Sequence, residues 1–232
     1  MTPPFRVSHV VFDIDGTLVD FVAAYHAGMR AAAERASQVL GRPVSSDDLR
    51  AAQRGAAAEL RDVGLPTGEA RALAFRRAVA ALGCDEAGVI SVATTFERVR
   101  DGLLQPYADV EETVAGLHER GLVLVAASNG NADMARLPVF RYFSATWFAE
   151  AAGVAKPDPR FFLGALSHAG ARAEAALMVG DRLDNDYEPA RAAGMHAVLL
   201  DREDRVEDAS VVRIRVLTEL LEMVEREAPR AG

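Results

Sequence analysis

Two aspartates, Asp13 and Asp15, follow a short apolar segment at residues 10–12, and Gly16 and Thr17 come directly after them. Carboxylates this close together repel one another and are costly to ionise unless a cation or hydrogen bonds compensate them. The pair could therefore hold a cation at the end of a buried strand. The alternative for an isolated pair is a solvated turn, because aspartate and glycine are ordinary turn residues.

Further polar residues follow other apolar segments along the chain. They are Ser128, Asn129, Lys156, Asp181 and Asp186. Taken singly, each has a plain explanation, since Ser-Asn-Gly is a common turn, a loop lysine is usually solvated, and aspartates often cap helices. In open parallel sheets, however, ligands bind beyond the carboxyl ends of the strands. The whole set, with each member at a strand end or in an adjoining loop, favours a binding site over a series of turns.

The pattern of apolar segments predicts the elements that must position these residues. Strands are expected at 10–12, 122–127, 145–148, 177–179, 197–200 and, more weakly, 211–214. Helices are expected at 21–40, 46–63 with Ser46 in its N-cap, 67–83, 92–103, 110–120, 159–169, 189–193 and, as an amphipathic surface helix, 217–226. This alternation predicts a Rossmann-like α/β fold, in which a parallel sheet carries helices on both faces.

The helices expected between residues 19 and 103 interrupt the alternation directly after the first strand. We therefore expect residues 1–18 and 104–232 to form the α/β core domain. Residues 19–103 would form a smaller, all-helical cap domain inserted into it. The alternative is an independent helical domain that shares no cleft with the core.

Composition narrows the class of partner. The formal net charge of −8 argues against nucleic acid, whose binding depends on neutralising phosphates with Lys and Arg. Cys84 is the only cysteine, which excludes a disulfide framework and a thiolate zinc cluster. The sequence has no run long enough to span a membrane and no signal-peptide pattern, so we expect a cytoplasmic protein without a membrane partner. The sequence carries no prediction of an oligomeric state.

The motifs, in this order, resemble those of the haloacid dehalogenase-like (HAD) hydrolase superfamily, and the resemblance spans almost the whole chain. The run Val-Phe-Asp-Ile-Asp-Gly-Thr-Leu-Val-Asp at 11–20 is similar to the first and most specific motif of the family. Residues 128–130 are similar to the second motif, residues 156–157 to the third and residues 180–186 to the fourth. The helical insertion is similar to the cap of the family's first cap class.

The resemblance implies a role for each residue at the strand ends. Asp13 would be the nucleophile that forms an aspartyl-phosphate, and Asp15 would protonate the leaving oxygen and then activate water. The phosphoryl group would be bound by Ser128, by the backbone N–H of Asn129 and by Lys156, which would also balance the nucleophile. Gly16 and Thr17 would lie beside the substrate.

The resemblance also implies a cofactor, Mg²⁺, which takes oxygen ligands and binds carboxylates together with substrate phosphate. Its ligands would be the Asp13 carboxylate, the Asp15 backbone carbonyl and the Asp181 carboxylate. Asp186 would contact the metal directly, hold a metal-bound water or orient Lys156.

Asp15 separates two activities within the family. The dehalogenases of the family carry no acid two residues after the nucleophile, because a leaving halide needs no proton. Asp15 therefore favours an oxygen leaving group, and we expect a Mg²⁺-dependent phosphatase that cleaves a small phosphorylated metabolite. Residues 128–132 and 185–188 look like those of members that hydrolyse nucleotides, flavin mononucleotide or related sugar phosphates.

Two alternatives remain open. A phosphomutase of the same superfamily would need a cap that excludes water while the phosphoryl group returns, and no feature of the sequence can be tied to that task. A non-catalytic regulatory protein on the same scaffold is expected to lack one or more of the acids, yet Asp13, Asp15, Lys156 and Asp181 are all present.

Overall fold

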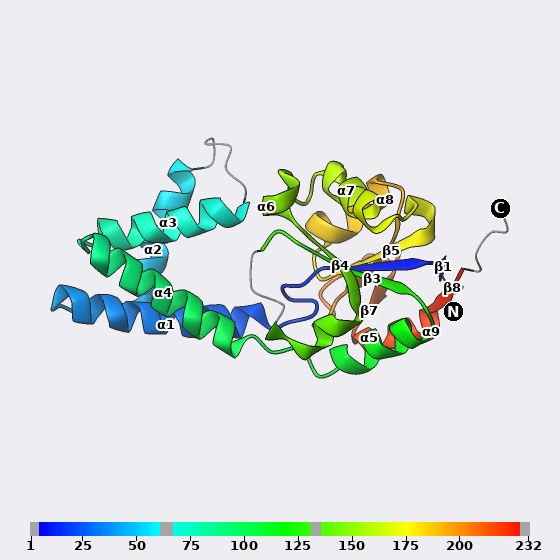
Figure 1. The fold of residues 1–232 in the computed structure, drawn as a ribbon, viewed down its shortest axis with the longest axis horizontal. Coiled ribbons are helices and arrows are strands. Elements are labelled where there is room, and N and C mark those ends of the chain that lie inside the picture. The colour runs from blue at the N-terminus through cyan, green and yellow to red at the C-terminus, as the bar shows by residue number, and fades with distance from the viewer. Residues whose placement is uncertain (1–4, 61–66, 131–135, 228–232) are drawn as a thin grey trace. The chain divides into compact units, whose positions relative to one another are not determined.

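The computed structural model describes residues 5–60, 67–130 and 136–227. The chain forms two compact units: unit 1 contains Met1–Val19 and Gln105–Gly232, and unit 2 contains Asp20–Leu104. Figure 1 shows the strands gathered in unit 1, whereas the described residues of unit 2 are helical. Across the described ranges, no helix combines the length and the apolar character needed to cross a bilayer.

Unit 1 is built on a six-stranded parallel sheet with the strand order β4-β3-β2-β5-β6-β7. The strands are β2 (His9–Phe12), β3 (Val123–Ser128), β4 (Phe143–Phe148), β5 (Ala176–Gly180), β6 (His196–Leu200) and β7 (Arg213–Ile214). β2 lies between β3 and β5, and His9 is in register with both Val123 and Ala176. The carboxyl ends of these three strands therefore lie side by side, and each leads into one of the polar segments.

Helices cover both faces of this sheet (Figure 1). One face carries α6 (Ala149–Ala152), α7 (Pro159–Ala169) and α8 (Glu188–Ala192), and the other carries α5 (Val110–Glu119) and α9 (Leu220–Met223). Short 3-10 helices lie at Pro138–Tyr142, Ala173–Ala175 and Leu217–Glu219, with one π-helical turn at Leu183–Tyr187. Val11, Val125 and Met178 pack with Phe161 of α7 in one core cluster, while Val10 and Phe12 are buried toward the opposite face. The expected α/β fold is confirmed.

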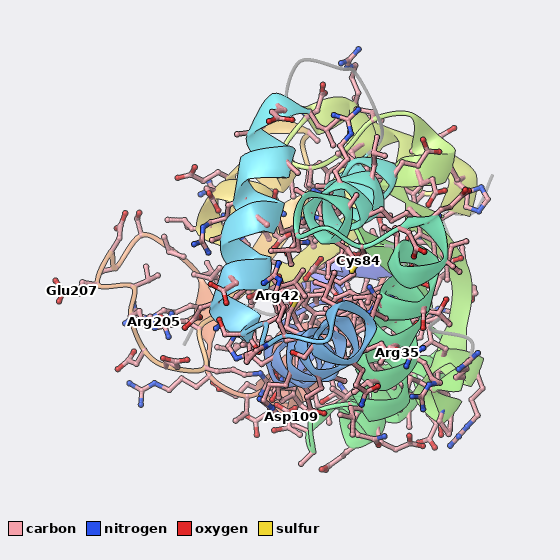
Figure 2. All side chains as sticks on the ribbon, turned by 90° about the vertical axis from the view of Figure 1, so that its left-hand side faces the viewer. Arg35, Arg42, Cys84, Asp109, Arg205 and Glu207 are labelled. Atoms are coloured by element: carbon pink, nitrogen blue, oxygen red, sulfur yellow. The ribbon has the colours of Figure 1, made fainter. Side chains whose placement is uncertain are left out.

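Unit 2 consists of α1 (Phe21–Leu40), α2 (Ser46–Glu59), α3 (Thr67–Ala81) and α4 (Glu86–Leu103). Small residues let α1 and α4 approach closely: a Cβ added to Gly28 would lie 3.0 Å from Phe96. Arg35, labelled in Figure 2, lies on α1. Its Nε donates to Ser91 Oγ of α4 at 2.7 Å and ties the same two helices together. Phe75 and Phe96 stack with ring centroids 4.6 Å apart, so the unit has an apolar core of its own.

The helix bounds follow the sequence pattern closely where capping residues fix them. The helices expected at 21–40 and 159–169 are confirmed with the same bounds. The N-cap of α2 is Ser45 rather than Ser46, because Ser45 Oγ accepts from the Asp48 N–H while Asp48 accepts from the Ser45 N–H. α2 ends at Glu59, and most of its expected continuation to residue 63 lies outside the described residues.

The surface helix expected at 217–226 is wrong. Leu217, Leu220 and Val224 are buried at a helix-like spacing, but α9 ends at Met223 and the chain continues as β8 (Val224–Arg226). β8 pairs in parallel with β1 (Phe5–Val7) in a separate two-stranded sheet. The hydrogen bonds of this pairing come from the other end of the chain, so local periodicity does not reveal them.

Candidate active site

The loop after β2 turns tightly at the carboxyl edge of the sheet. The N–H groups of Thr17, Leu18 and Val19 all point to the carbonyl oxygen of Ile14. Gly16 stands at φ +90°, and a Cβ on it would lie 2.5 Å from Asp181 Oδ2. Glycine is thus required here both by the backbone conformation and by the close approach of a carboxylate from the loop after β5.

Lys156 lies at the centre of the site, with its side chain 1% exposed. It is the only lysine among the 26 basic residues of the sequence. Its ammonium donates to Asp13 Oδ1, to Asp186 Oδ1 at 2.7 Å and to the Ala127 carbonyl at 3.3 Å, which accounts for its three N–H groups. Burial alone would lower the pKa of Lys156, but the two carboxylates outweigh burial and raise it, so the group is a fixed positive charge.

Both oxygens of the Asp13 carboxylate accept hydrogen bonds. Oδ1 accepts from Lys156, and Oδ2 accepts from Thr17 Oγ1 at 3.3 Å. Asp13 itself is 6% exposed, whereas Thr17 is completely buried. The expected place of Thr17 beside the substrate stays a prediction, and in the structure its buried hydroxyl donates to the Asp13 carboxylate.

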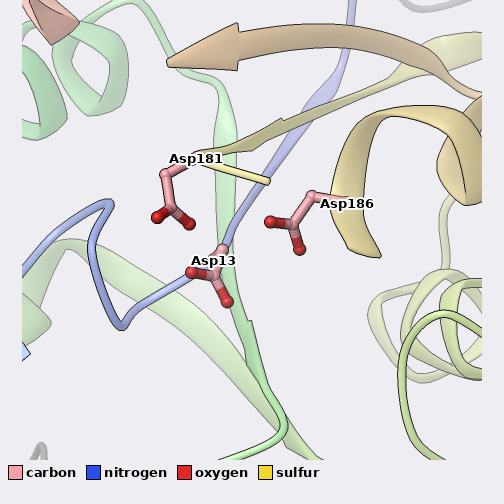
Figure 3. Close-up of side chains that lie close together, drawn as sticks. All are labelled: Asp13, Asp181 and Asp186. Carbon is pink, nitrogen blue, oxygen red and sulfur yellow. The ribbon is translucent and has the colours of Figure 1, made fainter. Parts of the chain in front are cut away.

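Asp13, Asp181 and Asp186 converge from two segments of the chain (Figure 3). Each offers a carboxylate oxygen, and these oxygens lie within 4.8 Å of one another. Partial burial of its carboxyl group and the nearby Asp13 charge raise the pKa of Asp181 to about 6, and burial and the same charge raise the pKa of Asp186. Three carboxylates facing one ammonium leave excess negative charge among hard oxygen donors, and this set fits Mg²⁺.

The three acids are not equally free to bind an ion. Asp186 Oδ1 accepts from Lys156, and its Oδ2 accepts from the backbone N–H of Arg182 at 3.2 Å. Asp181 is exposed at the surface of the site. Both oxygens of Asp186 are therefore engaged in hydrogen bonds, as are both oxygens of Asp13, whereas Asp181 faces solvent.

The segment after β3 completes the edge. Ser128 Oγ accepts from the Gly130 N–H at 2.8 Å and donates to Asp15 Oδ2 at 3.5 Å. A Cβ on Gly130 would lie 2.7 Å from the same Asp15 oxygen. Asp15 is thus placed against the segment after β3, beside the hydroxyl of Ser128.

Asn129 has a function that the sequence did not reveal. Its Nδ2 donates to the Lys156 carbonyl at 2.9 Å, and its Oδ1 accepts from the Lys156 N–H at 2.8 Å. This pair of bonds fixes the loop that carries the lysine. The sequence motif implies a role only for the backbone N–H of Asn129, because no local pattern links two residues that are 27 positions apart.

Comparison with known proteins identifies the family to which the chain belongs. The family model of haloacid dehalogenase-like hydrolases matches residues 7–194. The chain belongs to this family. This HAD-like hydrolase is 33% identical over 151 residues to the glyceraldehyde 3-phosphate phosphatase of Methanopyrus kandleri, covering 59% of the chain and 64% of that protein. It is 29% identical over 219 residues to the ribulose-1,5-bisphosphate 5-phosphatase of Halopiger xanaduensis, covering 90% of the chain and 91% of that protein.

Among solved structures, the HAD-like hydrolase is similar to the 2-haloacid dehalogenase of Pseudomonas syringae pv. Tomato DC3000. The TM-score is 0.81 at 28% sequence identity, with 94% of this chain and 98% of the other covered. The chain spans less than two thirds of the length of several curated relatives, for example 43% of the phosphoserine phosphatase of Thermus thermophilus.

Proposed function

We propose that this HAD-like hydrolase is a Mg²⁺-dependent phosphatase that cleaves a small phosphomonoester, most readily a sugar phosphate, through an aspartyl-phosphate on Asp13. One observation carries the proposal: the Asp13 carboxylate is fixed by Lys156 on one oxygen and Thr17 on the other, at an acidic edge where Asp15 and Asp181 also lie. The named activities of the two curated relatives support the substrate class.

In the first step an oxygen of Asp13 bonds to phosphorus while the bond from phosphorus to the alcohol oxygen breaks. Asp15 gives a proton to the departing oxygen. In the second step Asp15 takes a proton from water, the water oxygen bonds to phosphorus, and phosphate leaves as the Asp13 carboxylate is restored. Lys156 stabilises the carboxylate in both steps by its bond to Oδ1.

Mg²⁺, held by Asp13, Asp181 and the Asp15 carbonyl, would supply positive charge to the phosphoryl oxygens and to the crowded acids. The Ser128 hydroxyl and the Asn129 N–H would bind a phosphoryl oxygen. Unit 2 would act as the cap that selects the substrate, because it is inserted directly after the proposed nucleophile loop.

A haloacid dehalogenase is the second candidate, favoured by the structural similarity to the Pseudomonas syringae enzyme. Asp15 argues against it, because halide leaves without a proton. Release of chloride from a 2-chloro acid, without release of phosphate from any ester, would decide for this candidate.

The deciding experiment measures phosphate release from a chromogenic phosphate ester and from a panel of phosphorylated metabolites, with and without Mg²⁺. We expect Asp13→Asn to abolish turnover, because an amide oxygen is a poor nucleophile, while the circular dichroism spectrum stays unchanged. Asp184→Asn is the matched control, since Asp184 is exposed and faces Arg182 in the same loop as Asp186. Full activity of the Asp13→Asn protein would refute the proposal, and an isomerised sugar phosphate in place of free phosphate would point to a mutase.

A further inference from the structure

Arg202, which follows β6, joins distant parts of unit 1. Its guanidinium donates to both oxygens of Asp109, from Nη1 to Oδ2 at 2.8 Å and from Nη2 to Oδ1 at 3.0 Å. The same group lies over the ring of Tyr107, 4.1 Å from its centre. Arg202, Asp109 and Tyr107 form the Arg202 clamp.

The clamp reaches the loop that carries the proposed nucleophile. Arg202 Nη2 donates to the Thr17 carbonyl at 3.2 Å, and the Tyr107 N–H donates to the Leu18 carbonyl at 3.1 Å. Thr17 Oγ1 in turn donates to Asp13 Oδ2 at 3.3 Å. A continuous series of hydrogen bonds thus leads from the guanidinium through Thr17 to the carboxylate.

Two carbonyl groups of this loop, at the buried residues Thr17 and Leu18, accept hydrogen bonds from outside the loop. Its internal hydrogen bonds use the carbonyls of Ile14 and Val19, which accept from the N–H groups of residues 16–19. The carbonyls of Thr17 and Leu18 accept from the clamp instead. The clamp therefore contacts the loop at the residue whose hydroxyl donates to Asp13.

Asp109 does not cap the helix at whose N-terminus it lies. It stands at the N-cap of α5, where an aspartate commonly accepts a hydrogen bond from the helix, yet its side chain makes no such bond. Its oxygens accept from Arg202 and from the Leu217 N–H at 2.8 Å. An ion pair that only fastened β6 to α5 would need no bond to Thr17, so the geometry points beyond a fastening role.

We propose that Arg202 and Asp109 are positioning residues for catalysis, which act through the Thr17 hydroxyl to orient the Asp13 carboxylate for attack. The inference rests on the proposed function of Asp13. Among the described residues, the side chains of Arg202 and Asp109 form no hydrogen bond with Asp13, Asp181 or Asp186, so their loss should change the rate of the chemical step and spare substrate binding.

The test compares Arg202→Met, Thr17→Val and the double variant in the full chain, with a phosphate ester and Mg²⁺. Each single change should lower kcat about ten- to a hundredfold at saturating Mg²⁺, with KM unchanged. The double variant should be no slower than Thr17→Val alone, because both changes remove the same support. Arg202→Lys should recover part of the rate, since an ammonium can still donate to the Thr17 carbonyl.

The matched control is Arg141→Met. Arg141 also pairs with a carboxylate of α5, Glu111, and lies over a tyrosine ring, Tyr142, at 4.6 Å. The kcat of this variant should equal that of the wild type. If Arg202→Met does not fold, Asp109→Asn provides the same readout with a side chain of nearly the same shape.

Two outcomes would overturn the inference: wild-type kcat in the folded Arg202→Met or Asp109→Asn protein, or losses that add fully in the double variant. An active Asp13→Asn protein would instead overturn the proposed function. The two failures are therefore distinguishable, because the first requires Asp13→Asn to be inactive.

Discussion

The Arg202 clamp and the Lys156 cluster, which consists of Lys156, Asp13, Asp181 and Asp186, both pair aspartates with a cation in unit 1. The pKa values of their aspartates are nevertheless shifted in opposite directions. In the clamp, burial would raise the pKa of Asp109, but hydrogen bonds from Arg202 and from the Leu217 N–H lower it. In the Lys156 cluster, burial and the charge of Asp13 raise the pKa values of Asp181, to about 6, and of Asp186. One cluster is electrostatically satisfied, and the other is not.

The difference is what separates a supporting contact from a site that binds ligands. A satisfied ion pair has nothing to gain from a further ion, whereas crowded carboxylates gain free energy from each positive charge that reaches them. The choice of cation follows the same division. Of the 26 lysines and arginines all but one are arginine, and the one lysine stands where a compact ammonium fits among three oxygens.

Exchanging that cation is expected to have the largest effect. Lys156→Arg keeps the charge, but a planar guanidinium cannot direct three donors at Asp13, Asp186 and the Ala127 carbonyl from one point. We expect kcat to fall about 10²–10³-fold, the loss seen when a preorganised donor is removed from an active site. Steady-state phosphate release measures it, and activity within threefold of wild type would show that only the charge matters.

Amine labelling sharpens the same prediction, because Lys156 carries the only side-chain amine. Reductive methylation should modify Lys156 far more slowly in the native protein than in the unfolded protein, because in the native protein the ammonium is buried and bonded to three oxygens. Equal rates would contradict the buried cluster.

The Lys156 cluster could be predicted from the sequence far better than the clamp. Asp13, Ser128, Lys156 and Asp181 lie in short motifs at strand ends, so their convergence follows once the parallel sheet is inferred. Arg202 and Asp109 lie 93 positions apart without a motif, and only the folded chain brings them together. The pairing of β8 with β1 escaped prediction for the same reason.

The next prediction concerns pH and Mg²⁺. Between the ordinary pKa of 3.8 and the raised pKa of about 6, folded Asp181 keeps its proton while the unfolded chain releases it. The contribution of Asp181 to stability therefore falls as the pH rises through this window in the absence of metal. The ionised carboxylate thus destabilises the metal-free fold, and Asp181→Asn removes this cost. The melting temperature of the variant should therefore rise relative to that of the wild type between pH 4.5 and 7 in EDTA.

Mg²⁺ should reverse the order of the two melting temperatures at pH 7, so that the wild type melts above the Asp181→Asn protein. An ion at 100 times its dissociation constant stabilises the fold that binds it by about 2.7 kcal/mol, and the Asp181→Asn protein should gain little of this. Asp184→Asn serves as the control and should respond to Mg²⁺ as the wild type does. Equal Mg²⁺ responses of wild type and Asp181→Asn would remove Asp181 from the ligand set.

The smallest effect is expected on the stability contributed by the clamp. Asp109→Asn loses the charged partner of Arg202, and we expect the free energy of unfolding to fall by about 1–3 kcal/mol in urea titrations. Because the pKa of Asp109 is lowered, its contribution is complete above pH 4 and is lost only as the pH falls further, so the deficit should be the same at pH 5 and pH 8. Glu111→Gln, in an exposed pair on the same helix, should leave the unfolding midpoint unchanged. A different result would be a loss of unfolding free energy in Asp109→Asn that grows between pH 5 and pH 8. That result would mean that the clamp and the Lys156 cluster titrate as one unit, and it would contradict the distinction between them.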